Sequence, residues 1–89
     1  AAWMAYGKDG EVLVVSFEAD PDAKFPEGHG CAEVYAGGSY VELEHVAPLA
    51  DLAPGETAQT SEQWLLFSLE DAQLTDTELA ARIRVMLAN

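Results

Sequence analysis

The sequence predicts a mainly β fold, a partial sandwich of about five antiparallel strands, followed by one C-terminal α-helix. Short segments rich in β-branched and aromatic residues alternate with turns that contain glycine, proline or aspartate. These turns are short, which favours antiparallel pairing because parallel strands need long crossover connections. Apolar residues at helical spacing occur in the last segment, so we expect the helix at the end of the chain.

The first two strands are predicted to form a hairpin. Residues 2–6 are rich in aromatic residues, and residues 11–19 are rich in β-branched ones. Residues 7–10 lie between them and contain the dipeptide Asp-Gly, which is a strong signal for a tight hairpin turn. Residues 12–15 are apolar without alternation, which indicates that the second strand is buried on both faces.

Two further strands are expected in the middle of the chain. Residues 20–30 hold two prolines, two glycines and four charged residues, which is typical of a loop. Residues 31–35 form a short predicted strand, and residues 40–46 form another after a turn at residues 36–39. Alternation places the side chains of the second strand on two faces. One face carries Val41, Leu43 and His45, and the other carries Tyr40, Glu42, Glu44 and Val46.

The segment that follows is a predicted loop and then the fifth strand. Pro48 and Pro54 end the preceding strand because proline cannot donate a hydrogen bond to a sheet. We expect Leu49 and Leu52 to anchor this loop on the core. The fifth strand is predicted for residues 59–69, with residues 64–67 as its buried centre.

The C-terminal helix is predicted for residues 75–88. Thr75 and Glu78 have the spacing of a capping box, in which each side chain bonds the other residue's backbone amide. Leu74 and Leu79 fit a hydrophobic staple. One apolar face is formed by Leu79, Ile83, Met86 and Leu87. The helix is expected to cover a face or an edge of the sheet, or to pack on a second copy of the chain.

The length of 89 residues predicts a single domain, residues 1–89, with the β region at residues 1–70. The one cysteine, Cys31, cannot form an intrachain disulfide. No apolar run approaches the roughly 20 residues of a membrane span, and the first residues lack the pattern of a signal peptide. We therefore expect a cytoplasmic protein. A chain this short gains from a partner subunit, and we expect a homodimer.

The charge restricts the classes of partner. Sixteen acidic residues against four basic ones give a net charge of −12. Binding to phosphate backbones or anionic membranes needs the opposite sign, so neither nucleic acid nor membrane is expected as a partner. A basic protein surface remains compatible with this charge.

The sequence offers few residues for chemistry. Glu42 and Glu44 would lie roughly 6.5–7 Å apart along one strand, a spacing near that of glycosidase carboxylates but also that of any solvated strand face. A metal site could use only His29, Cys31, Glu33 and His45, whose spacing matches no zinc pattern. We therefore predict no catalytic residue, no metal and no cofactor.

Several segments occur in an order that resembles a known family. They are Phe25-Pro-Glu-Gly28, Gly30-Cys-Ala-Glu-Val-Tyr35, Tyr40-Val-Glu-Leu-Glu44, Pro48-Leu49, Leu52-Ala-Pro-Gly-Glu56 and Trp64. Over residues 10–67 the chain resembles the C-terminal part of uncharacterised bacterial proteins with the galactose-mutarotase-like supersandwich fold. Ala47 replaces the glycine usual in that family. The family's domain is several times longer and builds its carbohydrate site from many strands, so the resemblance implies no complete enzyme here.

Three functions are compatible with these features. The first is a small non-catalytic β module that binds a carbohydrate or other small ligand. Its expected ligand-binding residues are His29, Glu33, Glu42, Glu44 and Trp64. The second is an acidic interaction module that occupies a basic partner surface. The third is a fragment of an epimerase or lyase that uses Glu42 or Glu44 with His45.

Overall fold

The computed structural model describes residues 2–69 and 74–88. Every strand pairing among these residues is antiparallel, which confirms the predicted mainly β fold with one C-terminal helix. The elements, in order, are β1 (Ala2–Lys8), β2 (Glu11–Phe17), β3 (Ala32–Ala36), β4 (Val41–His45), β5 (Gln63–Ser68) and α1 (Asp76–Ala88).

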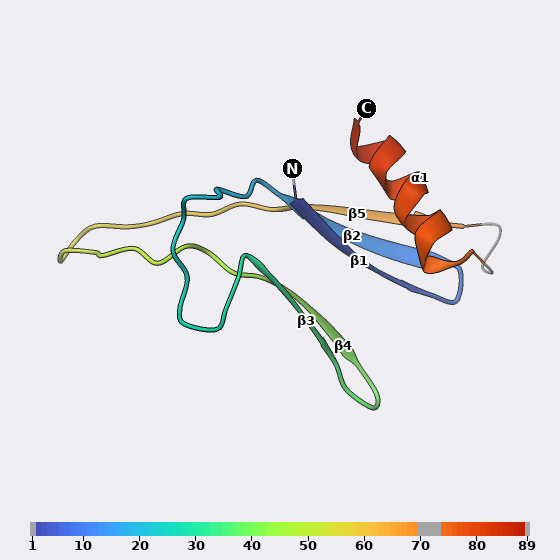
Figure 1. Ribbon diagram of the computed structural model, residues 1–89, viewed down its shortest axis with the longest axis horizontal. Coiled ribbons are helices and arrows are strands. Elements are labelled where there is room, and N and C mark those ends of the chain that lie inside the picture. The colour runs from blue at the N-terminus through green and yellow to red at the C-terminus, as the bar shows by residue number, and fades with distance from the viewer. Residues whose placement is uncertain (1, 70–73, 89) are drawn as a thin grey trace.

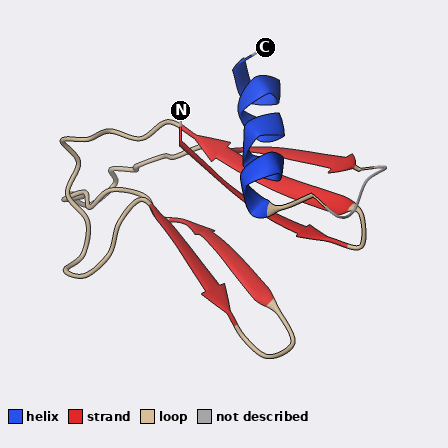
Figure 2. Cartoon of the chain, turned by 45° about the vertical axis from the view of Figure 1, so that its right-hand side comes forward, coloured by secondary structure: helices blue, strands red, loops and turns tan. Residues whose placement is uncertain are grey.

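The strands form two separate sheets. One has three strands in the order β1-β2-β5, and the other is the β3–β4 hairpin. Helix α1 crosses one face of the three-stranded sheet, and the hairpin projects on the other side with its tip free (Figures 1 and 2). The arrangement is three layers, of which the hairpin layer covers only part of the sheet beneath it.

The β1–β2 turn is tighter than predicted. The last pair of the ladder is Lys8 with Glu11, so only Asp9 and Gly10 form the turn. Both have positive φ, 54° and 80°, which is the conformation of a type I′ turn and the reason that Asp-Gly is favoured here. Strand β1 therefore runs two residues beyond its predicted end.

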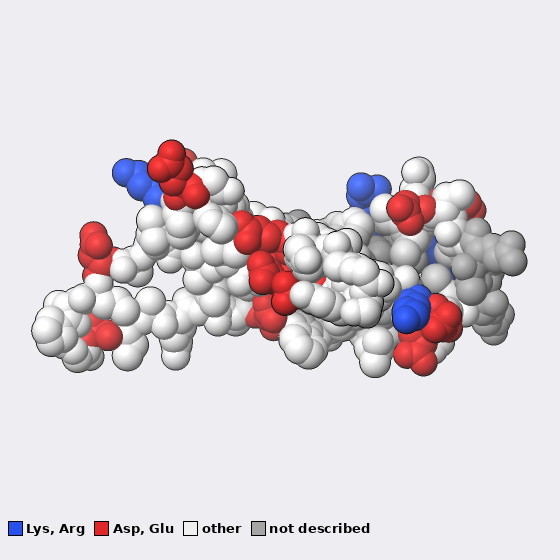
Figure 3. Space-filling model, turned by 90° about the horizontal axis from the view of Figure 1, so that it is seen from below, with Lys and Arg blue, Asp and Glu red and all other residues white. Residues whose placement is uncertain are grey.

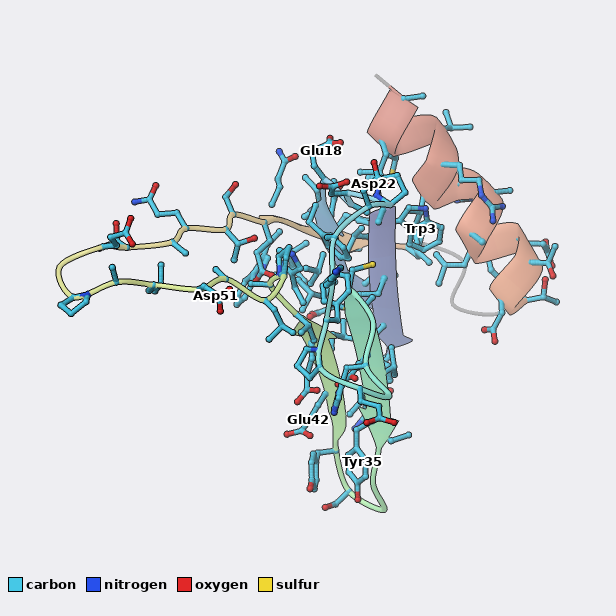
Figure 4. The ribbon with its side chains drawn as sticks, turned by 60° about the vertical axis from the view of Figure 1, so that its left-hand side comes forward. Trp3, Glu18, Asp22, Tyr35, Glu42 and Asp51 are labelled. Atoms are coloured by element: carbon cyan, nitrogen blue, oxygen red, sulfur yellow. The ribbon has the colours of Figure 1, made fainter. Side chains whose placement is uncertain are left out.

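Strand β2 is buried on both faces, as its uninterrupted apolar run predicted. On one face Val12 and Val14 pack with Ile83 of α1, and all three are almost inaccessible to solvent. Half-buried residues of β5 and α1 surround this first cluster, and Trp3 lies between β1 and α1 with the Arg84 guanidinium 5.8 Å from its ring (Figure 4).

A second cluster on the opposite face holds the hairpin. Met4, Val15 and Phe17 are buried there, and the half-buried Leu43 of β4 packs against them. Cys31, just before β3, also contacts this cluster. The two clusters are thus separated by the three-stranded sheet, and β2 contributes to both.

Helix α1 begins at the predicted capping box. The backbone N–H of Glu78 donates to Oγ1 of Thr75 at 3.2 Å, and the backbone N–H of Thr75 donates to the Glu78 carboxylate at 3.2 Å. The predicted apolar face is confirmed for the buried Ile83 and for the half-buried Leu79 and Leu87. Met86 does not belong to it, because its side chain is 40% exposed.

Replacing the cap should destabilise the helix measurably. We expect Thr75→Ala to lower the free energy of unfolding by about 0.5–2 kcal/mol, since it leaves the Glu78 amide without its side-chain acceptor. Thr77→Ala is the matched control, because Thr77 is the second residue of α1 and is exposed. It should change stability by less than about 0.5 kcal/mol. Chemical denaturation of both variants measures the difference, and equal effects would contradict the capping role.

The predicted burial of β5 is confirmed on one face and wrong on the other. Leu65 and Phe67 are half-buried against the first cluster, but Trp64 is 66% exposed and Leu66 is 73% exposed. The strand is also shorter than predicted and begins at Gln63. The physical reason is its position, because β5 is the last strand of its sheet and the hairpin packs over β1 and β2 instead.

The prediction that Leu49 and Leu52 anchor a loop on the core is also wrong. They are 61% and 54% exposed, because residues 47–62 extend away from both sheets as a long arm (Figure 1). At its tip the backbone N–H of Glu56 donates to the carbonyl of Ala53 at 3.0 Å. Gly55 there has a φ of 87°, which a glycine adopts without strain. The arm is a turn at the end of two extended segments, and near its base the backbone N–H of Leu49 donates to the carbonyl of Lys24 at 2.8 Å.

Candidate functional site

The structure places the five predicted ligand residues in two separate groups. His29, Glu33, Glu42 and Glu44 lie on or beside the β3–β4 hairpin, whereas Trp64 lies on β5 of the other sheet. The hollows found on the described surface are lined by other residues than these five. The five residues therefore do not form a single cleft in the described structure.

Three carboxylates share the outer face of the hairpin. Glu33 lies directly opposite Glu44 in the ladder, and Glu42 lies opposite Tyr35. Alternation places them on the face opposite Val41, Leu43 and His45, as predicted. We call Glu33, Glu42 and Glu44 the acidic hairpin face. Acidic side chains gather beside the projecting hairpin in Figure 3, and Glu42 and Tyr35 lie toward its tip in Figure 4.

The electrostatics of this face favour a cationic group. Like charges directly opposite each other on a ladder repel, as Glu33 and Glu44 do here. The half-exposed ring of His29 contacts the Glu33 carboxylate through Nδ1, and so supplies a proton donor at one end of the face. A lysine or arginine of a partner would relieve the remaining repulsion.

The side chain of His45 is buried and contacts Phe17 and Glu62. Its side chain is 6% exposed, and its ring stacks on Phe17 with a centroid separation of 4.1 Å. Its Nδ1 atom lies 3.0 Å from Oε2 of Glu62. The prediction that His45 shares the inner face with Val41 and Leu43 is confirmed, and its contacts give it a packing role between the hairpin and the sheet.

Glu62 is a residue that the sequence interpretation missed. Its Oε2 atom bonds His45, and its Oε1 atom accepts a hydrogen bond from the indole Nε1–H of Trp64 at 2.7 Å. The contact with Trp64 could have been suggested by the i, i+2 spacing of the two residues. The contact with His45 could not, because the two residues are 17 positions apart in sequence. Glu62 fixes the rotamer of an exposed tryptophan and ties the end of the arm to the hairpin.

Two apolar rows cross the three-stranded sheet on its hairpin side. The register joins Met4, Val15 and Trp64 in one row, and Tyr6, Leu13 and Leu66 in the next. The first row is buried except at Trp64, because the hairpin covers its other members. The second row lines a hollow of about 380 Å³ together with charged residues of the β1–β2 turn. We call Tyr6, Leu13, Trp64 and Leu66 the open sheet face.

The residues considered for a metal site are used otherwise. His29 contacts Glu33, His45 contacts Phe17 and Glu62, and Cys31 is half-buried against the second cluster. Within residues 2–69 and 74–88, no three His, Cys, Asp or Glu side chains are placed to hold a metal ion.

Comparison with family models, with curated proteins and with solved structures found no match for this chain. The resemblance to galactose-mutarotase-like proteins therefore stays a prediction. Helices long and apolar enough to cross a membrane are not found in the part of the chain that the structure describes.

Proposed function

We propose that this chain is a non-catalytic β module that binds another protein across its incompletely covered apolar surface. The observation that carries the proposal is the accessible surface area, which is 6873 Å². A compact protein of 9.6 kDa exposes about 5,100 Å². The chain thus exposes about 1,800 Å² more than a self-sufficient domain of its mass.

This excess has the size of one side of an obligate protein interface. Such interfaces bury about 2,000–5,000 Å² in total, or about 1,000–2,500 Å² on each partner. The shape agrees, since the radius of gyration is 15.5 Å against about 12 Å for a compact chain of 89 residues. The excess surface is explained if the folded state normally includes a partner.

The exposed side chains are those of a protein interface. The open sheet face offers two large aromatic rings and Leu66, and aromatic residues are enriched at the centres of interfaces. The acidic hairpin face beside it can serve as a polar rim. In the acidic interaction alternative, this face would instead contact a basic partner surface, whose opposite charge would speed association.

The arrangement gives no support to the epimerase or lyase alternative. General acid–base catalysis needs its groups within hydrogen-bonding reach of the same substrate. Glu42 and Glu44 are on the outer face of β4, whereas His45 is on the inner face and is occupied by Phe17 and Glu62. The three side chains therefore cannot act together on one substrate.

Site-specific crosslinking tests the proposal. A photoreactive amino acid at position 66, on the open sheet face, should crosslink to a protein in cells that express the chain. The same group at position 39, at the exposed tip of the hairpin, is the matched control. The proposal predicts one discrete product that is specific to position 66. Equal, diffuse labelling at both positions would refute it.

A small-ligand function at Trp64 is a second candidate. The indole ring is 66% exposed and its N–H is held by Glu62, so its apolar face is fixed and open to stacking, as the face of a sugar requires. Titration with a panel of saccharides should shift the indole N–H resonance of Trp64 if this function is real. Unchanged spectra with every saccharide would refute this small-ligand function.

The free thiol of Cys31 fits the proposed cytoplasmic location, where thiols stay reduced.

A further inference from the structure

We propose that the protein partner is a second copy of this chain, and that the β5 strands of the two copies pair antiparallel along their free edges. This inference rests on the proposed protein-binding function and names its partner. Among the described residues, β5 is the last strand of the sheet and pairs only with β2. Its second edge is the place where a further strand can add.

The free edge presents a regular set of backbone groups. The N–H of Leu69 donates to the carbonyl of Gly10 at 2.6 Å, which marks these two residues as a hydrogen-bonded pair. Hydrogen-bonded and non-bonded pairs alternate along an antiparallel ladder. The residues of β5 that bond β2 are therefore Gln63, Leu65 and Phe67, and the N–H and C=O groups of Trp64, Leu66 and Ser68 point outward.

These outward groups are self-complementary. If Leu66 lies opposite Leu66 of a second copy, Trp64 lies opposite Ser68 in both directions. Each of these three pairings then joins residues whose N–H and C=O groups face each other, as an antiparallel ladder requires. The result is a continuous six-stranded sheet with a two-fold axis at Leu66.

A strand beside β5 would also cover apolar side chains on both faces of the sheet. On the hairpin side it would flank Trp64 and Leu66. On the helix side lies a hollow of about 520 Å³ whose walls include Phe67, Val85 and Met86. Val85 is 65% exposed and Met86 is 40% exposed. Because side chains alternate along a strand, an added β5 fills both spaces at once.

The distribution of charge favours a second copy over a basic segment. Residues 63–69 carry no charged side chain, although the whole chain has a net charge of −12. Residues 79–88 of the adjoining helix contain two arginines and no acid. Two copies can therefore pair residues 63–69 without opposing acidic groups along that stretch, whereas a basic peptide would gain no ion pair there.

The edge also lacks the devices that normally prevent strand addition. Natural edge strands are protected by lysine, proline or a bulge, and β5 has none of these along its paired length. An unprotected apolar edge is expected where pairing is part of the native assembly. Its burial, together with both flanking faces, would cover part of the excess surface of each chain.

The oligomeric state of matched variants tests this pairing. At micromolar concentrations, light scattering should give twice the chain mass for the wild type and the mass of a single chain for Leu66→Lys. Leu66 is 73% exposed in one chain, so the substitution leaves the single chain folded, which circular dichroism checks. Two lysines facing each other at the axis should weaken association at least about 100-fold. Tyr40→Lys, at a 56% exposed position on the hairpin, should remain dimeric.

Cysteine crosslinking tests the register. In a Cys31→Ser background, Leu66→Cys should form an intermolecular disulfide under mild oxidation, since Cα atoms of a hydrogen-bonded antiparallel pair lie about 5.5 Å apart. Ser39→Cys in the same background should not. A monomeric wild type overturns the inference, as does a dimer that survives Leu66→Lys without crosslinking at position 66. If position 66 instead crosslinks to a different protein, the proposed function stands and the second copy is refuted.

Discussion

Ile83→Ala is expected to lower the free energy of unfolding by about 2–5 kcal/mol. Ile83 is 1% exposed and is the residue of α1 that packs directly with Val12 and Val14. Truncation removes three carbons from a closely packed cluster and leaves a cavity that the rigid sheet cannot fill. A small domain has only about 5–15 kcal/mol of stability, so the loss is a large share of the total.

Graded variants make this prediction specific to the cluster. Ile83→Val should cost about 0.5–1.5 kcal/mol, and the exposed Thr77→Ala less than about 0.5 kcal/mol. Denaturant unfolding at one fixed protein concentration measures all three, because association would otherwise change the apparent stability. A cost below 1 kcal/mol for Ile83→Ala would show that α1 does not hold its position through this contact.

The elements that the sequence predicted well have local causes. The turn at Asp9 and Gly10 follows from the φ values that these two residue types tolerate. The start of α1 follows from two side chains, Thr75 and Glu78, that are three residues apart. The two faces of β4 follow from the two-residue period of a strand. In each case the interacting groups are neighbours in the sequence.

The elements that the sequence predicted poorly depend on distant partners. Trp64 and Leu66 have the composition of a buried strand, and alternation cannot reveal that no element of the described chain covers them. The same limit applies to Leu49 on the arm. Burial of Trp64 and Leu66 is decided by what packs on β5, which the apolar composition of the strand does not reveal.

The candidate site shows the same division. The outward placement of Glu42 and Glu44 follows from strand period, and so does the inward placement of His45. The bond from His45 to Glu62 joins residues 17 positions apart and could not be predicted from spacing. His45 was considered as an acid or base, yet its partners make it a packing residue between the hairpin and the start of β5.

The contact between the hairpin and the sheet leads to the second large effect. Phe17→Ala is expected to cost about 3–5 kcal/mol. Phe17 is 4% exposed, belongs to the cluster with Met4 and Val15, and stacks on His45 at 4.1 Å. Its removal deletes one of the apolar contacts beneath the hairpin and the ring that stacks on His45, so the hairpin should loosen before the three-stranded sheet does.

Hydrogen exchange resolved by residue distinguishes this local effect from a general loss of stability. In Phe17→Ala the amides of β3 and β4 should exchange faster than those of β1 and β2, whereas in Ile83→Ala the amides of α1 should show the larger change.

Tyr35→Ala, which removes a 51% exposed aromatic ring from the hairpin itself, is the control and should lower the free energy of unfolding by less than about 1.5 kcal/mol. Uniform acceleration across all strands in Phe17→Ala would mean that the two apolar clusters unfold as one unit. Selective acceleration would establish that the hairpin is a separately held layer, attached to the sheet through Phe17 and His45.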